Sequence, residues 1–314
     1  MKWIIKNPAP NDSRRNNWGD HYFGQSLANA LREQGQSVSM HYHEQWFDAD
    51  EAADIVLVLR GRHRYRRAGR SRTAIHIMWN ISHPDDVSLE EYNEFDLVGV
   101  ASSTHAHKIR RNHFGRVFPL LQCTDTTRFF LPIDWQEQGR FRNGVVFVGN
   151  TRGQRRPAVL ELAGVNPALR VWGRGWDKAG VSNLVVAETI DNADIAEVYQ
   201  NARIGLNDHW PDMVERGFIN NRIFDALACG LPVLTDLHPA IAELFGGRCG
   251  VVYATEGNFR EALGRMLLEY PRLLEQASKT ARVVVEKHSF AARALELVEV
   301  VSEFSESGRR VAGG

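Results

Sequence analysis

Short apolar runs of strand length alternate with amphipathic stretches along most of the chain. This alternation is typical of βαβ units, in which helices cover a parallel sheet. Phe23, Leu27, Ala30 and Leu31 recur at helical spacing up to Gly35, which predicts a helix that stops at the glycine. The first half is also predicted to hold helices at 89–95 and 103–114, and strands at 2–7, 37–42, 54–59, 73–79 and 97–101.

The pattern predicts two successive domains of the α/β class, each Rossmann-like. The polar stretch 133–143 has no strong period and is expected to link an N-terminal domain at 1–132 to a C-terminal domain at 144–288. Segment 289–314 is predicted to be a terminal helix that packs back on the N-terminal domain, with a frayed tail from 305. Further strands are predicted at 145–148, 169–172, 184–187, 204–207, 232–235 and 251–253, and helices at 259–270, 271–288 and 290–304.

Composition narrows the class of protein. The 314 residues are 43% hydrophobic, and 38 basic residues balance 38 acidic ones, so a disordered chain or a globally basic nucleic-acid binder is not expected. No window resembles a membrane span or a signal-peptide core, which favours a soluble, cytoplasmic protein. Three scattered cysteines without a C-x-x-C pair, and histidines without a metal-binding spacing, predict no metal site.

One segment departs from this balance. Residues 60–72 read RGRHRYRRAGRSR, with seven arginines in thirteen positions between two predicted strands. One interpretation is a solvated loop, and the other is an anion-binding loop, since arginine forks bind phosphates and carboxylates bidentately. In the second interpretation Arg64, Arg66 and Arg67 would attract an anionic acceptor.

Loops that follow strands are where ligands bind in open α/β sheets, and the clearest of them opens a helix predicted at about 219–228 that stops at Gly230. Asn221 and Arg222 lie in its first turn, where free N–H groups, the helix dipole and a cation favour a phosphate. Asp225, three residues after Arg222, is placed to accept the hydroxyls of a ribose. An ordinary surface ion pair between Arg222 and Asp225 is the alternative.

Two further loops of the second domain carry glycines after strands. In 148–156, VGNTRGQRR, Gly149 and Asn150 permit close backbone approach, and Arg152 heads a group of cations. The segment is neither a G-x-G-x-x-G fingerprint nor a P-loop. Gly173, in WGRGW at 172–176, belongs either to a plain turn or to the same nucleotide site.

The first domain offers candidate acid–base groups. Gly19, Asp20 and His21 follow the first strand at the start of a helix, where Asp20 or His21 would deprotonate an acceptor hydroxyl. Asp20 is alternatively a plain N-cap. His83 precedes Pro84 after another strand, and the proline is expected to hold it in an extended conformation on the acceptor side.

The motif around Arg222 resembles that of GT-B fold glycosyltransferases. The motif R-x-F-E-A-x-A-C-G is matched in register by Arg222, Phe224, Ala226, Ala228, Cys229 and Gly230. The chain is similar in particular to the CgeB-like, spore-maturation-type group of these enzymes and more distantly to family 4. The segment Asn207 to His209 resembles a strand-to-loop segment of the same group. The chain departs from the motif at Asp225, where a glutamate is usual, and at Gly217, where family 4 has an earlier glutamate. The resemblance implies two domains that face one another across a cleft, with a nucleotide-sugar donor bound by the second domain and an acceptor bound by the first.

Together these features predict a glycosyltransferase that moves a sugar from a nucleoside diphosphate to an anionic or glycan acceptor, with no metal and no cofactor beyond the donor. Electrostatic stabilisation of the departing diphosphate would fall to Arg222, the helix N-terminus and the loop at 149–156. Two alternatives stay open. One is a sugar-nucleotide epimerase of the same architecture, and the other is an anion- or nucleic-acid-binding protein that relies on residues 60–72.

Overall fold

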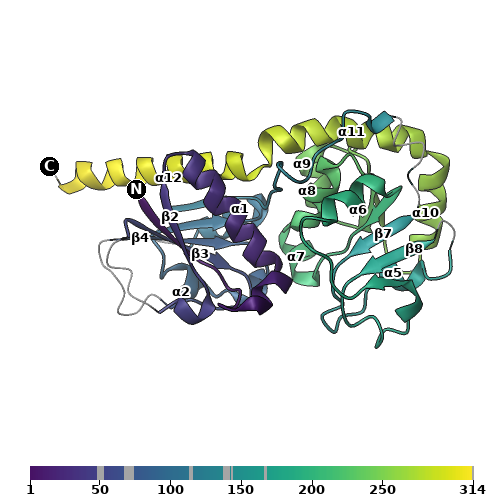
Figure 1. Ribbon diagram of the computed structural model, residues 1–314. Coiled ribbons are helices and arrows are strands. Elements are labelled where there is room, and N and C mark those ends of the chain that lie inside the picture. Colours follow the sequence, from purple (N-terminus) through teal and green to yellow (C-terminus); the bar gives the residue numbers. More distant parts are fainter. Residues whose placement is uncertain are drawn as a thin grey trace. The chain divides into compact units, whose positions relative to one another are not determined.

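The computed structural model describes residues 1–47, 53–66, 74–112, 116–136, 142, 144–165 and 168–312, the last six of these without their side chains. The chain divides into two compact α/β units (Figure 1). The first unit comprises Met1–Leu121 and His288–Gly314, and the second comprises Gln122–Lys287.

The described strands of the first unit form a six-stranded sheet in the order β2-β1-β3-β4-β5-β6, and every neighbouring pair is parallel. The strands are β1 (Lys2–Lys6), β2 (Ser37–His41), β3 (Ile55–Arg60), β4 (Ile75–Asn80), β5 (Leu97–Val100) and β6 (Arg116–Pro119). All six residues of β3 are buried, as expected of a central strand covered on both faces. The strand order reverses between β1 and β3, so the loops that leave these strands flank a topological switch point.

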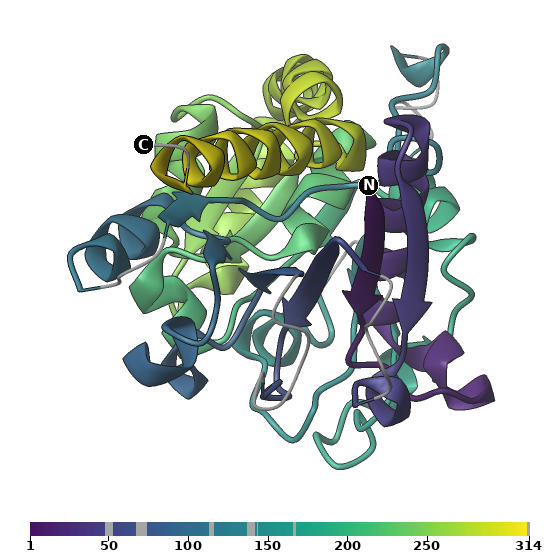
Figure 2. The same ribbon diagram turned by 90° about the vertical axis from the view of Figure 1, so that its left-hand side faces the viewer.

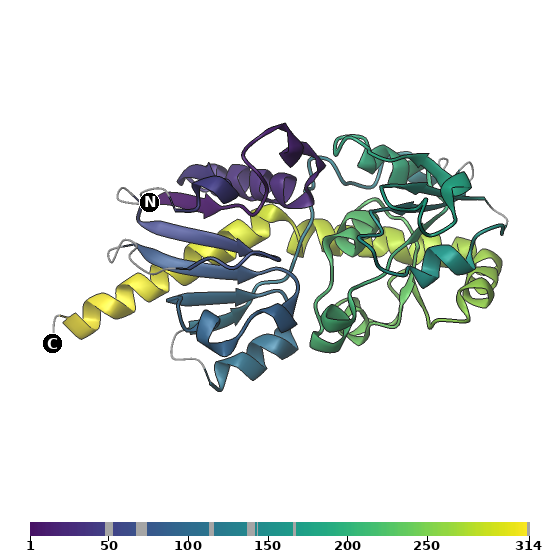
Figure 3. The ribbon, with the colours of Figure 1, turned by 90° about the horizontal axis from the view of Figure 1, so that it is seen from below.

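Helix α12 (Phe290–Ala312) lies beside α1 (Gly19–Glu33) within this unit, as Figure 2 shows, and it passes behind the strands in Figure 3. Phe23 of α1 packs edge-on against both Phe290 of α12 and Trp79 of β4, with ring centroids 4.8 Å and 5.1 Å away. The C-terminal helix therefore completes the core of the first unit. The remaining helices and turns are η1 (Ser13–Asn17), η2 (His43–Gln45), η3 (Pro84–Asp86), α2 (Leu89–Tyr92) and α3 (Ser103–Arg110).

The described strands of the second unit form another parallel six-stranded sheet, in the order β12-β11-β10-β7-β8-β9. They are β7 (Val145–Val148), β8 (Leu169–Trp172), β9 (Val185–Ala187), β10 (Ile204–Leu206), β11 (Val233–Asp236) and β12 (Val251–Ala254). Here the order reverses between β7 and β10, which is the dinucleotide-binding arrangement and places a second switch point between their loops.

Helix α8 (Asn221–Ala228) is the most buried helix around this sheet and packs against α11 (Tyr270–Lys287). It ends where Gly230 adopts a left-handed φ of 65°, which permits the tight return into β11. The other elements are α5 (Pro157–Glu161), η4 (Ser182–Leu184), α6 (Ile195–Asn201), α7 (Pro211–Arg216), α9 (Pro239–Phe245) and α10 (Phe259–Leu268).

The individually predicted strands and helices match those of the structure apart from their ends, whereas α5, α6, α7 and α9 were not predicted individually. Strand β6 was not predicted, because its four residues end in a proline and form too short a pattern. The last helix continues to Ala312, past the predicted fraying at 305. The first unit ends at Leu121, before the predicted boundary at 132, because residues 122–136 pack with the second unit. Among the described residues, no helix is long and apolar enough to cross a membrane.

Candidate functional site

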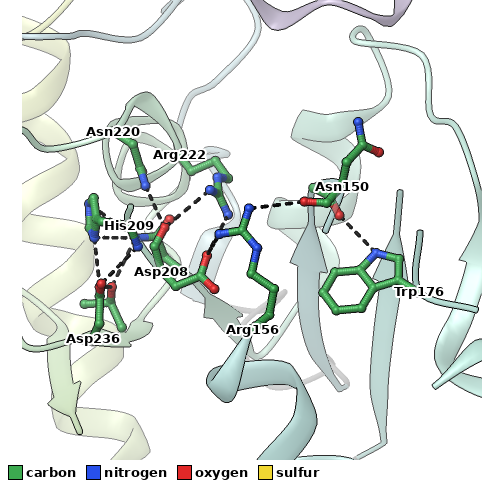
Figure 4. A network of polar contacts seen from close by, with 11 residues as sticks. Asn150, Arg156, Trp176, Asp208, His209, Asn220, Arg222 and Asp236 are labelled. Atoms are coloured by element: carbon green, nitrogen blue, oxygen red, sulfur yellow. Dashed lines mark hydrogen bonds and ion pairs between the residues drawn. The ribbon is translucent and has the colours of Figure 1, made fainter. Parts of the chain in front are cut away.

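Four loops leave the carboxyl ends of β7, β8, β10 and β11, and because these strands are parallel, their polar side chains meet at one edge of the second sheet (Figure 4). The centre of this edge is Asp208, which follows β10 and is only 5% exposed. Its Oδ1 accepts a hydrogen bond from Nη1 of Arg156 at 2.7 Å and lies 3.8 Å from Nη1 of Arg222. One buried carboxylate is therefore shared by two guanidinium groups from different loops.

The two arginines differ in how firmly they are held. Arg156 is buried, and its Nη2 donates to the Asn150 carbonyl at 3.2 Å. Arg222 keeps a side-chain exposure of 24%, and its Nη1 is a buried donor with no hydrogen-bond partner. Burial raises the pKa of the Asp208 carboxyl against the opposing influence of both arginines, and burial lowers the pKa of Arg156. Nε of the buried Arg156 also has no hydrogen-bond partner, but Arg222 is the more exposed of the two cations.

Two of the predicted donor residues, Gly149 and Gly173, shape the loop beside Arg222. Gly149 lies so close that a Cβ built on it would be 3.6 Å from Nη1 of Arg222. Gly173 has φ 138°, and a Cβ there would lie 2.2 Å from the Gly149 carbonyl oxygen, so only glycine allows the two loops to touch. The Trp176 indole donates to the same carbonyl at 3.1 Å. Gly173 is therefore a packing residue that shapes the loop beside Arg222.

The predicted residues Asn150 and Arg152 point elsewhere. The Asn150 carboxamide points away from Asp208 in Figure 4, and its Oδ1 accepts from the Arg174 backbone N–H at 2.7 Å. Arg152 is exposed, has a left-handed φ of 51°, and lines a cavity formed by the loops after β7 and β8. The Asn150 side chain is thus turned away from the Asp208 centre, whereas the charge of Arg152 still contributes to lowering the pKa of Arg156 there.

Asp225 and Asn221 lie together on α8. Asp225 is buried, and its two carboxylate oxygens accept from the Thr124 hydroxyl at 2.6 Å and from Nδ2 of Asn221 at 3.0 Å. Burial raises the pKa of Asp225 to about 7, against these two hydrogen bonds. The alternative of a surface ion pair with Arg222 is wrong, because Asp225 is buried and Arg222 is directed at Asp208.

A second polar pair, between the buried His209 and the partly buried Asp236, supports the loop that carries Asp208. Nδ1 of His209 lies 2.8 Å from Oδ1 of Asp236, and the His209 backbone N–H donates to Oδ2 of the same carboxylate at 2.9 Å. Burial alone would raise the pKa of Asp236, but His209 and the Thr235 hydroxyl hold it well below its usual range. The Asn220 side chain donates to the Asp208 carbonyl at 2.9 Å, which fixes the loop against the start of α8.

In the first unit, Asp20 lies at the β1/β3 switch point. A Cβ built on Gly61, directly after β3, would be 3.6 Å from Oδ1 of Asp20 and 3.6 Å from Oγ of Ser82. The alternative role of Asp20 as an N-cap is wrong, because α1 begins at Gly19 with Trp18 as its N-cap residue. The Asp20 carboxylate instead reaches the carboxyl ends of β3 and β4.

His21 faces the interior of the same unit. It is 4% exposed, and its Nδ1 lies 2.9 Å from the Tyr42 hydroxyl. Burial lowers its pKa. Asp20 and His21, adjacent in the sequence, therefore point to different surroundings, and Asp20 is the one at the switch point.

Sequence reasoning did not single out His63, which follows β3 within the arginine-rich run. Its ring stacks on Trp18 with centroids 6.2 Å apart and lies 4.6 Å from the His43 ring. Burial and then His43 lower the pKa of His63, while the charge of Asp20 opposes them. A carboxylate, an imidazole and a half-exposed tryptophan thus gather beside β1 and β3.

His83 does not have the predicted extended conformation. Its φ of 51° and ψ of 56° are left-handed, and its carbonyl accepts from the Asp86 N–H at 3.1 Å in the turn η3. The following proline disfavours the right-handed helical region, so this residue starts the turn from the left-handed one. His83 is 7% exposed, which places it in the interior.

Carboxylates in α2 and just after it partly neutralise the arginine-rich run. Arg60 is buried and paired with Glu91, with Nε 2.6 Å from Oε1. Arg64 donates to Glu94 at 2.5 Å and lies 3.7 Å from Glu91. Arg66 is exposed, and Arg67 lies outside the described residues. Within the described part of the chain, no group of three or more His, Cys, Asp or Glu side chains is placed to hold a metal ion.

Comparison with known proteins identifies the architecture. The sequence profile of a family described as "Glycosyl transferase-like" matches residues 155–299, which include Arg156, Asp208, Arg222 and Asp225. Sucrose-phosphate synthase from Thermosynechococcus elongatus superposes with a TM-score of 0.72 at 12% identity, covering 98% of this chain and 100% of that one. The chain has the GT-B fold.

Two other solved structures are similar. HepE of Anabaena, in complex with UDP-glucose, has a TM-score of 0.64 at 14% identity and covers 96% of this chain and 100% of its own. A glycosyltransferase from Rickettsia africae has a TM-score of 0.64 at 12% identity, and the match covers 96% of this chain and 98% of that one. No curated protein sequence matches significantly. The fold prediction and the prediction of a glycosyltransferase-type enzyme are confirmed.

Proposed function

We propose that this glycosyltransferase transfers a sugar from a nucleoside diphosphate to an acceptor without a metal ion. The observation that carries the proposal is the pair of guanidinium groups, Arg156 and Arg222, that share Asp208 at the β7/β10 switch point, next to the N-terminus of α8. Such cations and free backbone N–H groups stabilise the negative charge that develops on a departing diphosphate.

The two arginines have different roles in this proposal. Arg222, with an unpartnered Nη1, binds the diphosphate directly, whereas Arg156 anchors Asp208 and the loop after β7. Gly149 allows the diphosphate to approach the backbone next to Arg222. No divalent ion is required for this charge stabilisation if the guanidinium groups supply it.

Asp225 and Asn221 hold the donor ribose in this proposal. An ionised carboxylate offers about four acceptor positions, and Thr124 and Asn221 occupy two of them, which leaves acceptors for ribose hydroxyls. Because HepE is known in complex with UDP-glucose, UDP-sugars are the first donors to test.

The first unit supplies the acceptor side. Asp20 is the proposed base for an inverting reaction, since its carboxylate lies at the β1/β3 switch point next to Gly61 and Ser82. His63 and Trp18, rather than His21 and His83, form the surface beside it. The pairing of Arg60 and Arg64 with carboxylates weakens the interpretation of the arginine-rich run as a nucleic-acid site.

A ligand-binding screen tests this function. UDP-glucose and UDP are expected to raise the melting temperature, whereas uridine, which has no diphosphate, is not. A ligand at 100 times its Kd stabilises the folded state by about 2.7 kcal/mol. The shift should persist in EDTA, and release of UDP should follow when an acceptor panel is added. Absence of a shift with every nucleoside diphosphate sugar would contradict the proposal, and an epimerised donor without acceptor would indicate the epimerase instead.

A further inference from the structure

A cavity of about 580 Å³ lies beside the Asp208 centre, between the loop after β7 and the loop after β8. Its volume is in the range of small-molecule sites. It is lined by Arg152, Arg174 and Lys178, together with Arg155, and no carboxylate is among the residues that line it. The cavity is therefore positively charged, although the whole chain is neutral.

The cations differ in how far they are already engaged. Arg155 forms an ion pair with Glu256, outside the lining. Arg174 and Lys178 are exposed, and among the described residues no carboxylate oxygen lies within ion-pair distance of either side chain. Two cations at the mouth of the cavity are thus available to an anion.

The walls of the cavity are fixed to one another. The Thr151 N–H donates to the Arg174 carbonyl at 3.0 Å, and the Arg174 N–H donates to the Asn150 side chain at 2.7 Å. Gly175, with φ 84°, packs so tightly that a Cβ would lie 2.3 Å from Oγ1 of Thr151. These contacts hold the backbone at Arg174 in place, so the cations do not depend on a loop rearrangement to face the cavity.

We propose that this cavity is a second anion site, which binds a phosphate group other than the diphosphate at Arg222. The Asn150 carboxamide points away from Asp208 and toward the loop of Arg174, so the two sites use opposite sides of the same loop (Figure 4). A phosphate ester suits the cavity because several cations without carboxylates match a multiply charged oxyanion. In this proposal the phosphate belongs to a phosphorylated molecule other than the donor, and it is bound without being transferred.

Pyrophosphate titration by calorimetry tests the proposal, because pyrophosphate is a probe for both sites. Wild-type protein is expected to bind two equivalents. Arg174→Gln combined with Lys178→Gln should weaken one of them about tenfold, and Arg222→Ala should weaken the other. Saturation with UDP should leave one equivalent of pyrophosphate bound.

The matched control is Arg170→Gln with Lys279→Gln, which removes one exposed arginine and one exposed lysine outside the cavity. An equal loss in this control would show only a general charge effect and would overturn the proposal. Displacement of both equivalents by UDP, or a single equivalent lost in Arg222→Ala alone, would overturn it as well. A single equivalent lost only in the Arg174 and Lys178 variant would support the cavity and contradict the proposed diphosphate site.

Discussion

Each of the two sheets carries a buried arginine–carboxylate pair near its carboxyl edge, and the two pairs are built differently. In the first unit, Arg60 donates to both oxygens of Glu91, at 2.6 Å and 3.2 Å, and to the carbonyls of Gly61 and Asp86. In the second, Asp208 is shared between Arg156 and Arg222, and Nε of Arg156 and Nη1 of Arg222 have no hydrogen-bond partner. The first pair is saturated, in the sense that every guanidinium nitrogen of Arg60 has a hydrogen-bond partner, and the second is not.

In the proposed function, this difference distinguishes a structural charge pair from one that binds a ligand. Because buried donors in folded proteins are nearly always paired, we interpret the unpaired Nη1 of Arg222 as the donor to the proposed diphosphate. The first edge offers a different chemistry, in which the Asp20 carboxylate lies near His63 and Trp18. One edge therefore suits an anion and the other suits removal of a proton from a hydroxyl.

The largest expected effect is the loss of turnover on replacing Asp20, which tests whether the carboxyl edge of the first sheet takes part in catalysis. For an inverting reaction, Asp20→Asn should lower turnover by about 100-fold to 10,000-fold. UDP-glucose affinity should stay near the wild-type value, because in the proposed reaction the carboxylate contacts only the acceptor. His21→Gln, which alters a buried neighbour, should change turnover much less. Near-normal turnover in Asp20→Asn would remove this residue from the reaction.

Breaking the two buried pairs tests the comparison directly. Glu91→Ala leaves Arg60 buried without its carboxylate and should lower the free energy of unfolding by about 3–5 kcal/mol, measured by urea denaturation. Asp208→Ala should destabilise the protein by a similar amount, and it alone should also lower UDP affinity. If the folded Glu91→Gln variant also bound UDP poorly, the assignment of Glu91 to structure alone would be wrong.

Arg222 should show the reverse pattern, with a large effect on binding and a small one on stability. Its ion pair with Asp208 is long, at 3.8 Å, and its side chain is partly exposed, so Arg222→Ala should change the unfolding midpoint little. Loss of a charged hydrogen bond to the diphosphate should weaken UDP binding about tenfold to a hundredfold. The control is Arg216→Ala, since Arg216 ends α7 and pairs with Glu215 at the surface. Unchanged UDP affinity in Arg222→Ala would remove this arginine from the site.

The fold was largely predictable from the sequence because its signals are local. Continuous apolar runs such as β3 indicate buried parallel strands, and Gly35 and Gly230, both with positive φ, end helices where the pattern stops. The site was predictable only in part. Arg222 and Gly149 were expected at one edge because parallel strands end together, and the structure brings them into contact.

The remaining site residues depend on contacts that the sequence pattern does not contain. The pairing of Arg156 with Asp208 joins residues 52 positions apart, and nothing in either loop identifies the partner. His63 lies within a run that holds seven arginines, so this segment is interpreted from its sequence by its positive charge, and the histidine is not considered separately. His83 was expected to be extended because the proline rule excludes one backbone region without choosing between the other two.

The pH dependence of donor binding tests the role of Asp225. Because burial raises its pKa to about 7, the carboxyl is mostly protonated at pH 6 and mostly ionised at pH 8. If the ionised form accepts the ribose hydroxyls, affinity for UDP-glucose should rise by up to about tenfold over this range. Asp225→Asn should flatten the profile. A wild-type profile equally flat would contradict the ribose assignment.

The same group affects stability in the opposite direction. Its folded pKa lies above the unfolded value of about 3.9, so its contribution to the free energy of unfolding is complete below about pH 4 and is lost as the pH rises through about 7. The unfolding free energy of the wild type should therefore fall from pH 5 to pH 8 more steeply than that of Asp225→Asn. Equal slopes would show that Asp225 is ionised throughout.

The smallest effect is expected from the arginine-rich run, where Arg64 and Arg66 form a matched pair. Arg64 is held by Glu94, whereas Arg66 is exposed with no ion pair among the described residues. With an anionic acceptor, Arg66→Gln should raise the apparent KM about twofold at low salt and not at high salt, because exposed charges act mainly through screened attraction. Arg64→Gln should change it less, since its charge is already compensated. An equal change in the KM of both variants would mean that Arg64 attracts the acceptor as strongly as Arg66 despite its ion pair with Glu94. The distinction between paired and unpaired arginines would then not hold in the first unit.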